Sequence, residues 1–229
     1  MSRRRAPLLE RAGSERTSDV RELGVVLPLA FHGDDGALVT AVKEGHAGAK
    51  AALFQRYSSF VERVITHVLG FDAELADILQ EVFLNALASI QKLKDPQLLR
   101  PWLYQVATLT ARKVLRRRSR RKWLRLFVDT DEEARWEIEN ARGDASSESR
   151  RALFAVYSVL ERLPADERIS FALRYMEGLE LTEVAGACGV SLATIKRRLR
   201  RAELRFTKAA GRHPELREWL EGGARWENP

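Results

Sequence analysis

Apolar side chains recur at helical spacing through the first half of the chain, from about residue 34 to residue 126. A short amphipathic stretch around residues 38–42 comes first and is broken by the glycines of residues 45–48. Over residues 53–68 the apolar positions fall three or four apart and stop at Gly70, which predicts one long core helix. These apolar positions are Leu53, Phe54, Tyr57, Phe60, Val61, Val64, Ile65 and Val68.

A wide apolar stripe over residues 75–90, which includes Phe83, predicts the next helix. Asp72 is suited to cap its N-terminus. The opposite face of this helix is polar, and it carries Asp77, Gln80, Glu81 and Asn85. Taken alone, this polar patch is typical of a solvated helix surface.

Residues 92–101 form a connector with two prolines, of which Pro101 suits the first turn of a further helix. That helix begins with a packed face and ends with nine Lys or Arg among the fourteen residues 112–125, without an acidic residue. Because such a block would repel itself on a free helix, we expect it to lie along the phosphates of a nucleic acid. Trp102 and Tyr104 could stack on bases there, although for Trp102 the residue type favours a core position.

The second half of the chain predicts two more helices, over residues 152–163 and 166–175, followed by a helix–turn–helix. In this motif Thr182 is a plausible N-cap of the first helix, and Gly189 supplies the residue that can take a positive φ in the turn. Ser191 caps the second helix, which runs to about Phe206.

The second helix of this motif has two contrasting faces. One face is apolar and consists of Leu192, Ile195, Leu199, Ala202 and Phe206. The other face consists of Ala193, Thr194, Arg197, Arg200 and Arg201, with Lys196 and Arg198 on the flanks. Small residues followed by cations suit a recognition helix in the major groove, and we favour this interpretation over a solvated basic surface.

Two segments lack such patterns. Residues 1–33 are rich in Arg and Ser without periodicity, which is typical of a disordered tail. Residues 128–149 are strongly acidic and contain Gly and Ser, which predicts a flexible linker. The sequence therefore predicts an all-α protein with two small helical domains, over residues 34–127 and 150–208, and a C-terminal tail over residues 209–229.

The chain of 229 residues carries 39 Lys and Arg against 32 Asp and Glu, a formal charge of +7 that favours a polyanionic partner. Cys188 is the single cysteine, which excludes an intramolecular disulfide and a zinc site built from several cysteines. The longest apolar run, over residues 23–31, is too short to span a membrane and contains Pro28. We therefore expect a cytoplasmic protein without membrane insertion.

The sequence contains no arrangement of residues typical of an enzyme. Its four histidines are scattered without metal-ligand spacing, and it has no P-loop or nucleotide-binding glycine pattern. We therefore expect no catalytic residue, no metal and no cofactor. A DNA recombinase is the enzymatic alternative, and it would need a nucleophilic Ser or Tyr in an Arg-rich pocket or clustered carboxylates for a metal.

Two stretches resemble the extracytoplasmic-function sigma factors of the sigma-70 family of bacterial transcription initiation factors. The first reads ELADILQEVFLNAL, followed by RPWLYQVATLTARKVLRRRSRR, and is similar to the second conserved region of that family. The other reads LERLPADERISFALRYMEGLELTEVAGACGVSLATIKRRLRRA and is similar to the fourth. The resemblance covers most of residues 35–207 and implies a non-enzymatic specificity subunit that opens promoter DNA by binding energy.

The resemblance also implies roles for particular residues. Those that match the polymerase-docking helix are Asp77, Gln80, Glu81 and Phe83. On the side of the minus-10 element, the matching DNA-binding residues are Lys94, Arg100, Trp102, Arg112, Arg116, Arg117 and Arg120. In the helix that would read the minus-35 element they are Ser191, Thr194, Lys196, Arg197, Arg200 and Arg201.

The partners that the resemblance implies are core RNA polymerase, double-stranded promoter DNA with the melted non-template strand, and an anti-sigma factor. The chain departs from the family pattern at Leu109 and Lys113, where the family often has Asn and Asp. Residues 97–99 likewise replace a stretch that usually holds Phe. The family's promoter preferences therefore do not carry over. The non-sigma alternative is a helix–turn–helix regulator that acts without polymerase, and such a protein has no need for the polar patch at residues 77–83.

Overall fold

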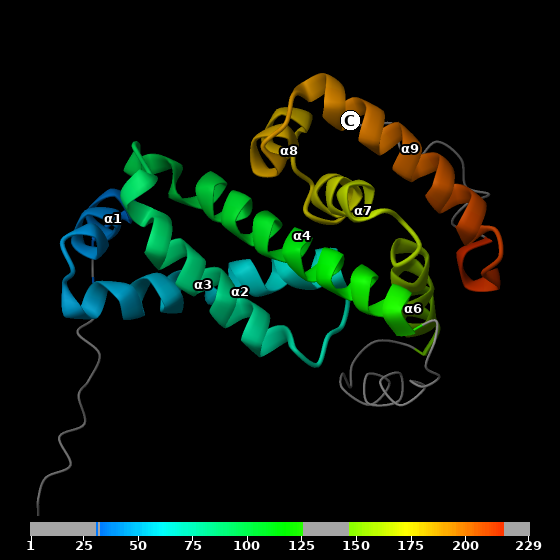
Figure 1. Ribbon diagram of the computed structural model, residues 1–229, viewed down its shortest axis with the longest axis horizontal. Coiled ribbons are helices and arrows are strands. Elements are labelled where there is room, and N and C mark those ends of the chain that lie inside the picture. The colour runs from blue at the N-terminus through cyan, green and yellow to red at the C-terminus, as the bar shows by residue number, and fades with distance from the viewer. Residues whose placement is uncertain (1–30, 32, 126–146, 218–229) are drawn as a thin grey trace, which may run out of the picture.

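The computed structural model describes residue 31, residues 33–125 and residues 147–217, and all regular structure in these ranges is helical (Figure 1). The absence of strands there agrees with the expected all-α class. The predictions of a disordered tail over residues 1–33 and of a linker over residues 128–149 fall largely outside the described residues. Helix α6 begins at Ser147, so the last three residues assigned to the linker are helical.

The N-terminal domain is built from α1 (Asp35–Lys43), α2 (Ala47–Leu69), α3 (Leu75–Ser89) and α4 (Leu99–Arg125). Helices α2, α3 and α4 pack against one another, and the 3₁₀ turns η1 (Ile90–Lys92) and η2 (Pro96–Leu98) lead from α3 to α4. The core of this domain is formed by buried aliphatic side chains, among them Leu53, Val61, Ile65, Val82, Leu103 and Ala107.

The C-terminal domain contains α6 (Ser147–Leu160), α7 (Ala165–Phe171), α8 (Leu181–Cys188) and α9 (Leu192–Ala210). Helix α7 continues into a π-helical turn, η4 (Ala172–Met176), and the chain after α9 forms the 3₁₀ turn η5 (Pro214–Leu216). Helices α7, α8 and α9 pack together, with the ring of Phe206 stacked on that of Phe171 at 4.8 Å between centroids. Leu216 of η5 is buried in the same cluster.

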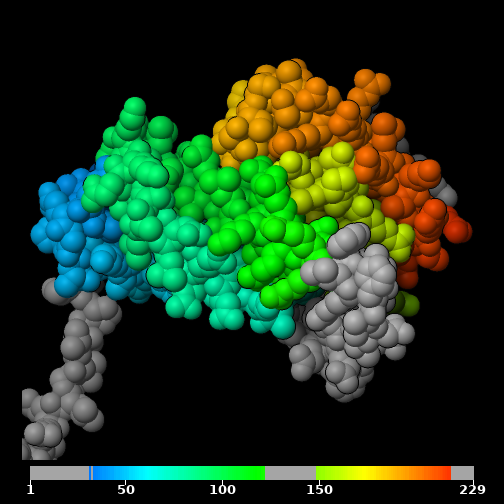
Figure 2. Space-filling model, in the orientation of Figure 1, coloured from blue at the N-terminus to red at the C-terminus, as the bar shows by residue number. Residues whose placement is uncertain are grey.

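The two domains are in direct contact. Helix α8 lies on α4, α7 also contacts α4, and η4 contacts α2 (Figure 1). One buried apolar cluster includes Leu103 and Ala107 of α4 together with Val184 and Ala187 of α8. Figure 2 shows the C-terminal domain seated directly against the N-terminal one. The two domains thus form one closed body.

The predicted helix ends were partly right. Gly70 ends α2 with φ 80°, Gly189 ends α8 with φ 66°, and the Ser191 side chain accepts a hydrogen bond from the Thr194 N–H. The prediction for Thr182 was wrong, because Glu180 is the N-cap of α8 and forms a capping box with Glu183.

The prediction that Asp72 caps α3 was wrong, because the N-cap is Glu74, two residues later. The Asp72 side chain instead accepts a hydrogen bond from the Glu74 N–H at 2.9 Å and orders the turn before α3. The local signal for a helix start was therefore correct within two residues.

Candidate nucleic-acid interface

The helix–turn–helix presents α9 on the outside of the C-terminal domain (Figure 1). The left-handed backbone at Gly189 lets its N–H reach the end of α8, and Ser191 then starts α9 with a 3.3 Å hydrogen bond from the Thr194 N–H. The apolar side of α9 is buried through Ile195, Leu199, Ala202 and Phe206. This packing fixes which side of α9 faces outward.

The outward side of α9 carries the cations that the sequence assigned to DNA. Their side chains are exposed at Lys196, Arg197, Arg200 and Arg201. Thr194 is half-buried, and the exposed Ser191 already uses its hydroxyl as a cap. Arg198 differs from its neighbours because its guanidinium donates to Asp166 at 3.1 Å and is largely covered. Four exposed cations and two short hydroxyl residues therefore lie along α9 away from its buried side.

The basic part of α4 divides into exposed and paired residues. Arg116 and Arg120 are exposed, whereas Arg117 lies 3.5 Å from the carboxylate of Glu74. Arg118 contacts both Glu74 and Asp72. The hydrogen bond from Arg118 lowers the pKa of Glu74. Two of the cations of α4 are thus engaged with the turn before α3.

Arg112, which the sequence assigned to DNA, is covered in this structure by the contact between the two domains. Its Nε donates to Asp166 of α7 at 2.8 Å, and its Nη2 lies 3.4 Å from the carbonyl oxygen of Cys188. Only 14% of its side chain is exposed. Arg112 therefore joins the two domains.

The connector before α4 and the first turn of α4 each offer a further cation. Lys94 and Arg100 are exposed, and the guanidinium of Arg100 lies 4.9 Å from the ring centroid of Phe60. Trp102 is half-buried and packs against the core of the N-terminal domain, so its place agrees with the core position that its residue type favoured.

The polar patch of α3 is accessible at Asp77 and Gln80, which are exposed. Glu81 is half-buried and accepts a hydrogen bond from Lys113 of α4 at 2.7 Å. Phe83 corrects the expectation of a docking residue, because only 5% of it is exposed and its ring packs on Phe54 at 4.8 Å. It supports the patch from beneath.

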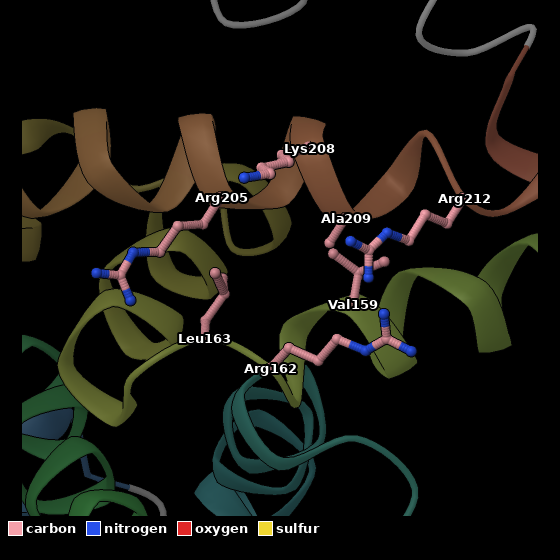
Figure 3. A pocket seen from close by; sticks show the side chains of 7 residues that line it. All are labelled: Val159, Arg162, Leu163, Arg205, Lys208, Ala209 and Arg212. Carbon is pink, nitrogen blue, oxygen red and sulfur yellow. The ribbon is translucent and has the colours of Figure 1, made fainter.

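A second basic surface follows the recognition residues along the same helix. A groove of about 310 Å³ lies between α6 and α9, with cationic side chains around it (Figure 3). Its apolar lining is Val159, Leu163 and Ala209, and its cations are Arg162, Arg205, Lys208 and Arg212. Arg205 lies 3.3 Å from Glu167, so part of this charge is compensated. The positive surface of α9 therefore extends beyond Arg201.

The sequence assigned no role to Glu177, whose carboxylate lies at the centre of a network between the domains. Arg63, His67 and Tyr104 of the N-terminal domain all bind it. An isolated acid beside Gly178 gives no local signal, since its partners lie 73 to 114 residues earlier in the chain.

Within the described ranges, no group of three His, Cys, Asp or Glu side chains is placed to hold a metal ion. Cys188 is buried, and burial raises the pKa of its thiol. In the same part of the chain no helix has the length and hydropathy to cross a membrane.

Two compact helical domains with an outward recognition helix and a basic helix define a DNA-binding protein. The family model for sigma-70 region 2 matches residues 53–121, and the model for sigma-70 region 4 matches residues 153–206. Together they span more than half of the chain, in the expected order. The chain belongs to the sigma-70 family, in its extracytoplasmic-function branch.

Curated relatives agree with this family. The chain is 27% identical over 173 residues to an ECF RNA polymerase sigma-E factor of Haemophilus influenzae, covering 73% of this chain and 90% of the relative. It is 28% identical over 175 residues to the sigma-E factor of Escherichia coli, with the same coverage. Over 193 residues it is 28% identical to the RNA polymerase sigma-H factor of Pseudomonas aeruginosa, covering 80% of this chain and 96% of the relative.

Solved structures share the fold. CnrH in complex with the cytosolic domain of CnrY matches with a TM-score of 0.54 and 18% identity, over 78% of this chain and 98% of that one. The sigma factor RpoE in complex with the anti-sigma factor NepR from Bartonella quintana matches with a TM-score of 0.51 and 19% identity, over 69% and 94%.

Proposed function

We propose that this chain is a specificity subunit that binds core RNA polymerase through α3 and directs it to promoters through α4 and α9. The observation that carries the proposal is the pairing, in one chain, of an exposed acidic and amide patch on α3 with an exposed recognition helix. A regulator that acts alone needs the second feature but not the first.

The minus-35 element is assigned to α9. A helix whose N-terminal turn bears the short residues Ser191 and Thr194 can approach the floor of the major groove. Four exposed cations follow this first turn along α9, and their long side chains can reach base edges or phosphates. They are Lys196, Arg197, Arg200 and Arg201.

The minus-10 element is assigned to α4 and the connector before it. Lys94, Arg100, Arg116 and Arg120 are exposed and positively charged, which suits the backbone of a melted non-template strand. Opening would be driven by binding energy, without covalent chemistry in this protein. Since Lys113 contacts Glu81 and Leu109 is exposed, the reading of this element is expected to differ from that of relatives with Asp and Asn there.

An inhibitory protein partner also belongs to this proposal. The structurally similar sigma factor RpoE of Bartonella quintana was solved with its anti-sigma factor NepR. We assign this chain a partner of the same kind, which would hold it inactive until released.

The test is capture of core RNA polymerase by the full chain and by the double variant Gln80→Ala/Glu81→Ala, in the absence of any inhibitory partner. Both residues lie on α3 away from the apolar core, so the variant should remain folded. The matched control is Gln55→Ala/Glu62→Ala, which removes the same two residue types from α2. We expect stoichiometric capture by the wild type and the control and loss of capture by the α3 variant.

No capture by folded wild-type protein would refute the proposal. The chain would then be treated as a helix–turn–helix regulator that binds DNA without polymerase. Equal capture by the wild type and the α3 variant would instead mean that Gln80 and Glu81 are not part of the docking surface.

A further inference from the structure

We propose that Glu177 is an intramolecular latch that holds the two domains closed and keeps them from engaging two promoter elements at once. The inhibitory part of this inference rests on the proposed function, whereas the latch itself is a statement about domain packing.

Glu177 follows the π-helical turn of the C-terminal domain, yet its hydrogen-bond partners belong to the N-terminal domain. Its side chain is 0% exposed. The carboxylate accepts hydrogen bonds from Arg63 of α2 at 3.1 and 3.2 Å and from the Tyr104 hydroxyl of α4 at 3.0 Å. His67 Nδ1 lies 2.5 Å from it. A buried carboxylate with this many donors is strongly held, and removal of one partner of such a group costs more than the loss of a surface pair.

A second carboxylate forms an anchor on the other side of the same contact. Asp166 of α7 accepts from Arg112 of α4 at 2.8 Å and from Arg198 of α9 at 3.1 Å. One acid thereby ties the basic helix of one domain to the recognition helix of the other.

Two side chains bonded to backbone carbonyls complete the contact. Arg168 of α7 donates from Nε to the carbonyl oxygen of Val68 at 2.6 Å, and Gln105 of α4 donates to that of Gly186 at 2.9 Å. Bonds of this kind need a fixed separation and orientation, so the domains meet in one arrangement.

This arrangement is incompatible with simultaneous reading of both elements. The minus-10 and minus-35 elements are named for positions about 25 base pairs apart, which is roughly 85 Å along B-form DNA. In the closed body the helices assigned to them share a single carboxylate, Asp166. The contact also covers Arg112, one of the residues expected to meet DNA. The domains must therefore separate before the promoter is bound.

The test uses the full chain with Glu177→Ala and Glu177→Gln. Glu177→Ala removes the acceptor from Arg63 and Tyr104, while Glu177→Gln keeps the size and loses the charge. Glu215→Ala is the matched control, because it removes an exposed acid of the same domain away from the contact. Arg63→Ala removes a partner of Glu177 that belongs to the N-terminal domain. Its effect therefore cannot come from misfolding of the helix–turn–helix.

Small-angle scattering at neutral pH is the first readout, with helicity checked by circular dichroism. We expect the wild type and Glu215→Ala to be compact, Glu177→Ala and Arg63→Ala to have a larger radius of gyration, and Glu177→Gln to fall between them. A fluorescent DNA duplex of mixed sequence is the second readout, and the open variants should bind it about tenfold more tightly, which is within the usual range of coupling between sites.

The latch would be overturned if the wild type had a radius of gyration as large as that of Glu177→Ala. It would also be overturned if Glu177→Ala and Arg63→Ala were both as compact as the wild type. Opening without any gain in duplex affinity would overturn its inhibitory role. If Glu177→Ala does not fold, Arg63→Ala and Glu177→Gln decide the question. None of these results depends on polymerase, so failure of the capture experiment would leave the latch standing, and the reverse also holds.

Discussion

Ser191 and Thr182 are hydroxyl residues that were both predicted to cap a helix, and they have different structural roles. Ser191 starts α9 by accepting the Thr194 N–H, which would otherwise lack a partner in the first turn of the helix. Thr182 lies inside α8, where Glu180 and Glu183 already satisfy the helix start. The start of the recognition helix thus depends on one serine side chain.

Ser191→Ala should lower the free energy of unfolding by about 1 kcal/mol, the usual cost of losing a hydroxyl N-cap. Thr182→Ala is the control and should change it by less than about 0.5 kcal/mol, because no cap is lost and alanine favours the helix interior. Thermal unfolding followed by circular dichroism checks both variants. Equal losses in the two variants would contradict the assignment of Glu180 as the cap of α8.

Residue roles were predictable where the cause was local and not where it was tertiary. Gly70, Gly189 and Ser191 were identified correctly because backbone conformation and capping depend on a few neighbours. The contacts of Arg112 and Glu177 between the domains were not predicted, since their partners lie 54 to 114 residues away in sequence. Charge alone cannot distinguish an arginine that meets DNA from one that meets a carboxylate.

In helix α9 the residues that pack in the core and the residues expected to contact DNA lie on opposite sides of the helix. Its buried side consists of Ile195, Leu199, Ala202, Phe206 and Ala210. The exposed side carries its cations at one or two per turn from Lys196 onward. Because the apolar side is fixed, a substitution on the exposed side should change binding without changing the fold.

Arg200→Ala should weaken binding to a DNA duplex and reduce the slope of log affinity against log salt by about 0.9, the change expected for one lost phosphate contact. Lys50→Ala, an exposed cation of α2 outside every basic surface described, is the control and should leave the slope unchanged. A fluorescence titration at several salt concentrations measures both. An unchanged slope for Arg200→Ala would place this residue on a base edge or off the DNA.

At the level of elements, the sequence predicted the helices with strong apolar stripes, α2, α3 and α9, close to their observed ends. It did not predict the π-helical turn η4, because a change from α to π hydrogen bonding leaves no periodic signal over five residues. That turn matters, since it ends next to Glu177 and directs this carboxylate toward α2 and α4.

The closed arrangement of the whole molecule is held by polar groups as well as by the apolar cluster that runs through both domains. The sequence predicted two domains with a linker but not their contact, since the apolar residues on α4 and α8 serve equally well for packing within each domain. Orientation comes from directional groups, above all the carboxylates of Glu177 and Asp166.

Glu177 also makes the stability of the closed molecule depend on pH. Burial alone would raise the pKa of this carboxyl, but hydrogen bonds from His67, Arg63 and Tyr104 outweigh burial and lower the pKa from 4.5 to about 2. A lowered pKa means that the stabilisation is present above pH 4.5 and is lost as the pH falls toward 2. At pH 5 it amounts to roughly 3 kcal/mol, given about 1.4 kcal/mol per pKa unit.

The measurement is the free energy of unfolding of the wild type and of Glu177→Gln in urea at pH 5 and at pH 3. Glutamine does not titrate, so the difference between the two proteins should shrink to less than half between these conditions. Glu215 is an exposed acid, so the variant Glu215→Gln should have the same free energy of unfolding as the wild type at both pH values. A difference that stays constant with pH would mean that Glu177 stabilises the molecule through its shape alone, and the charge of the carboxylate would then have no part in holding the domains together.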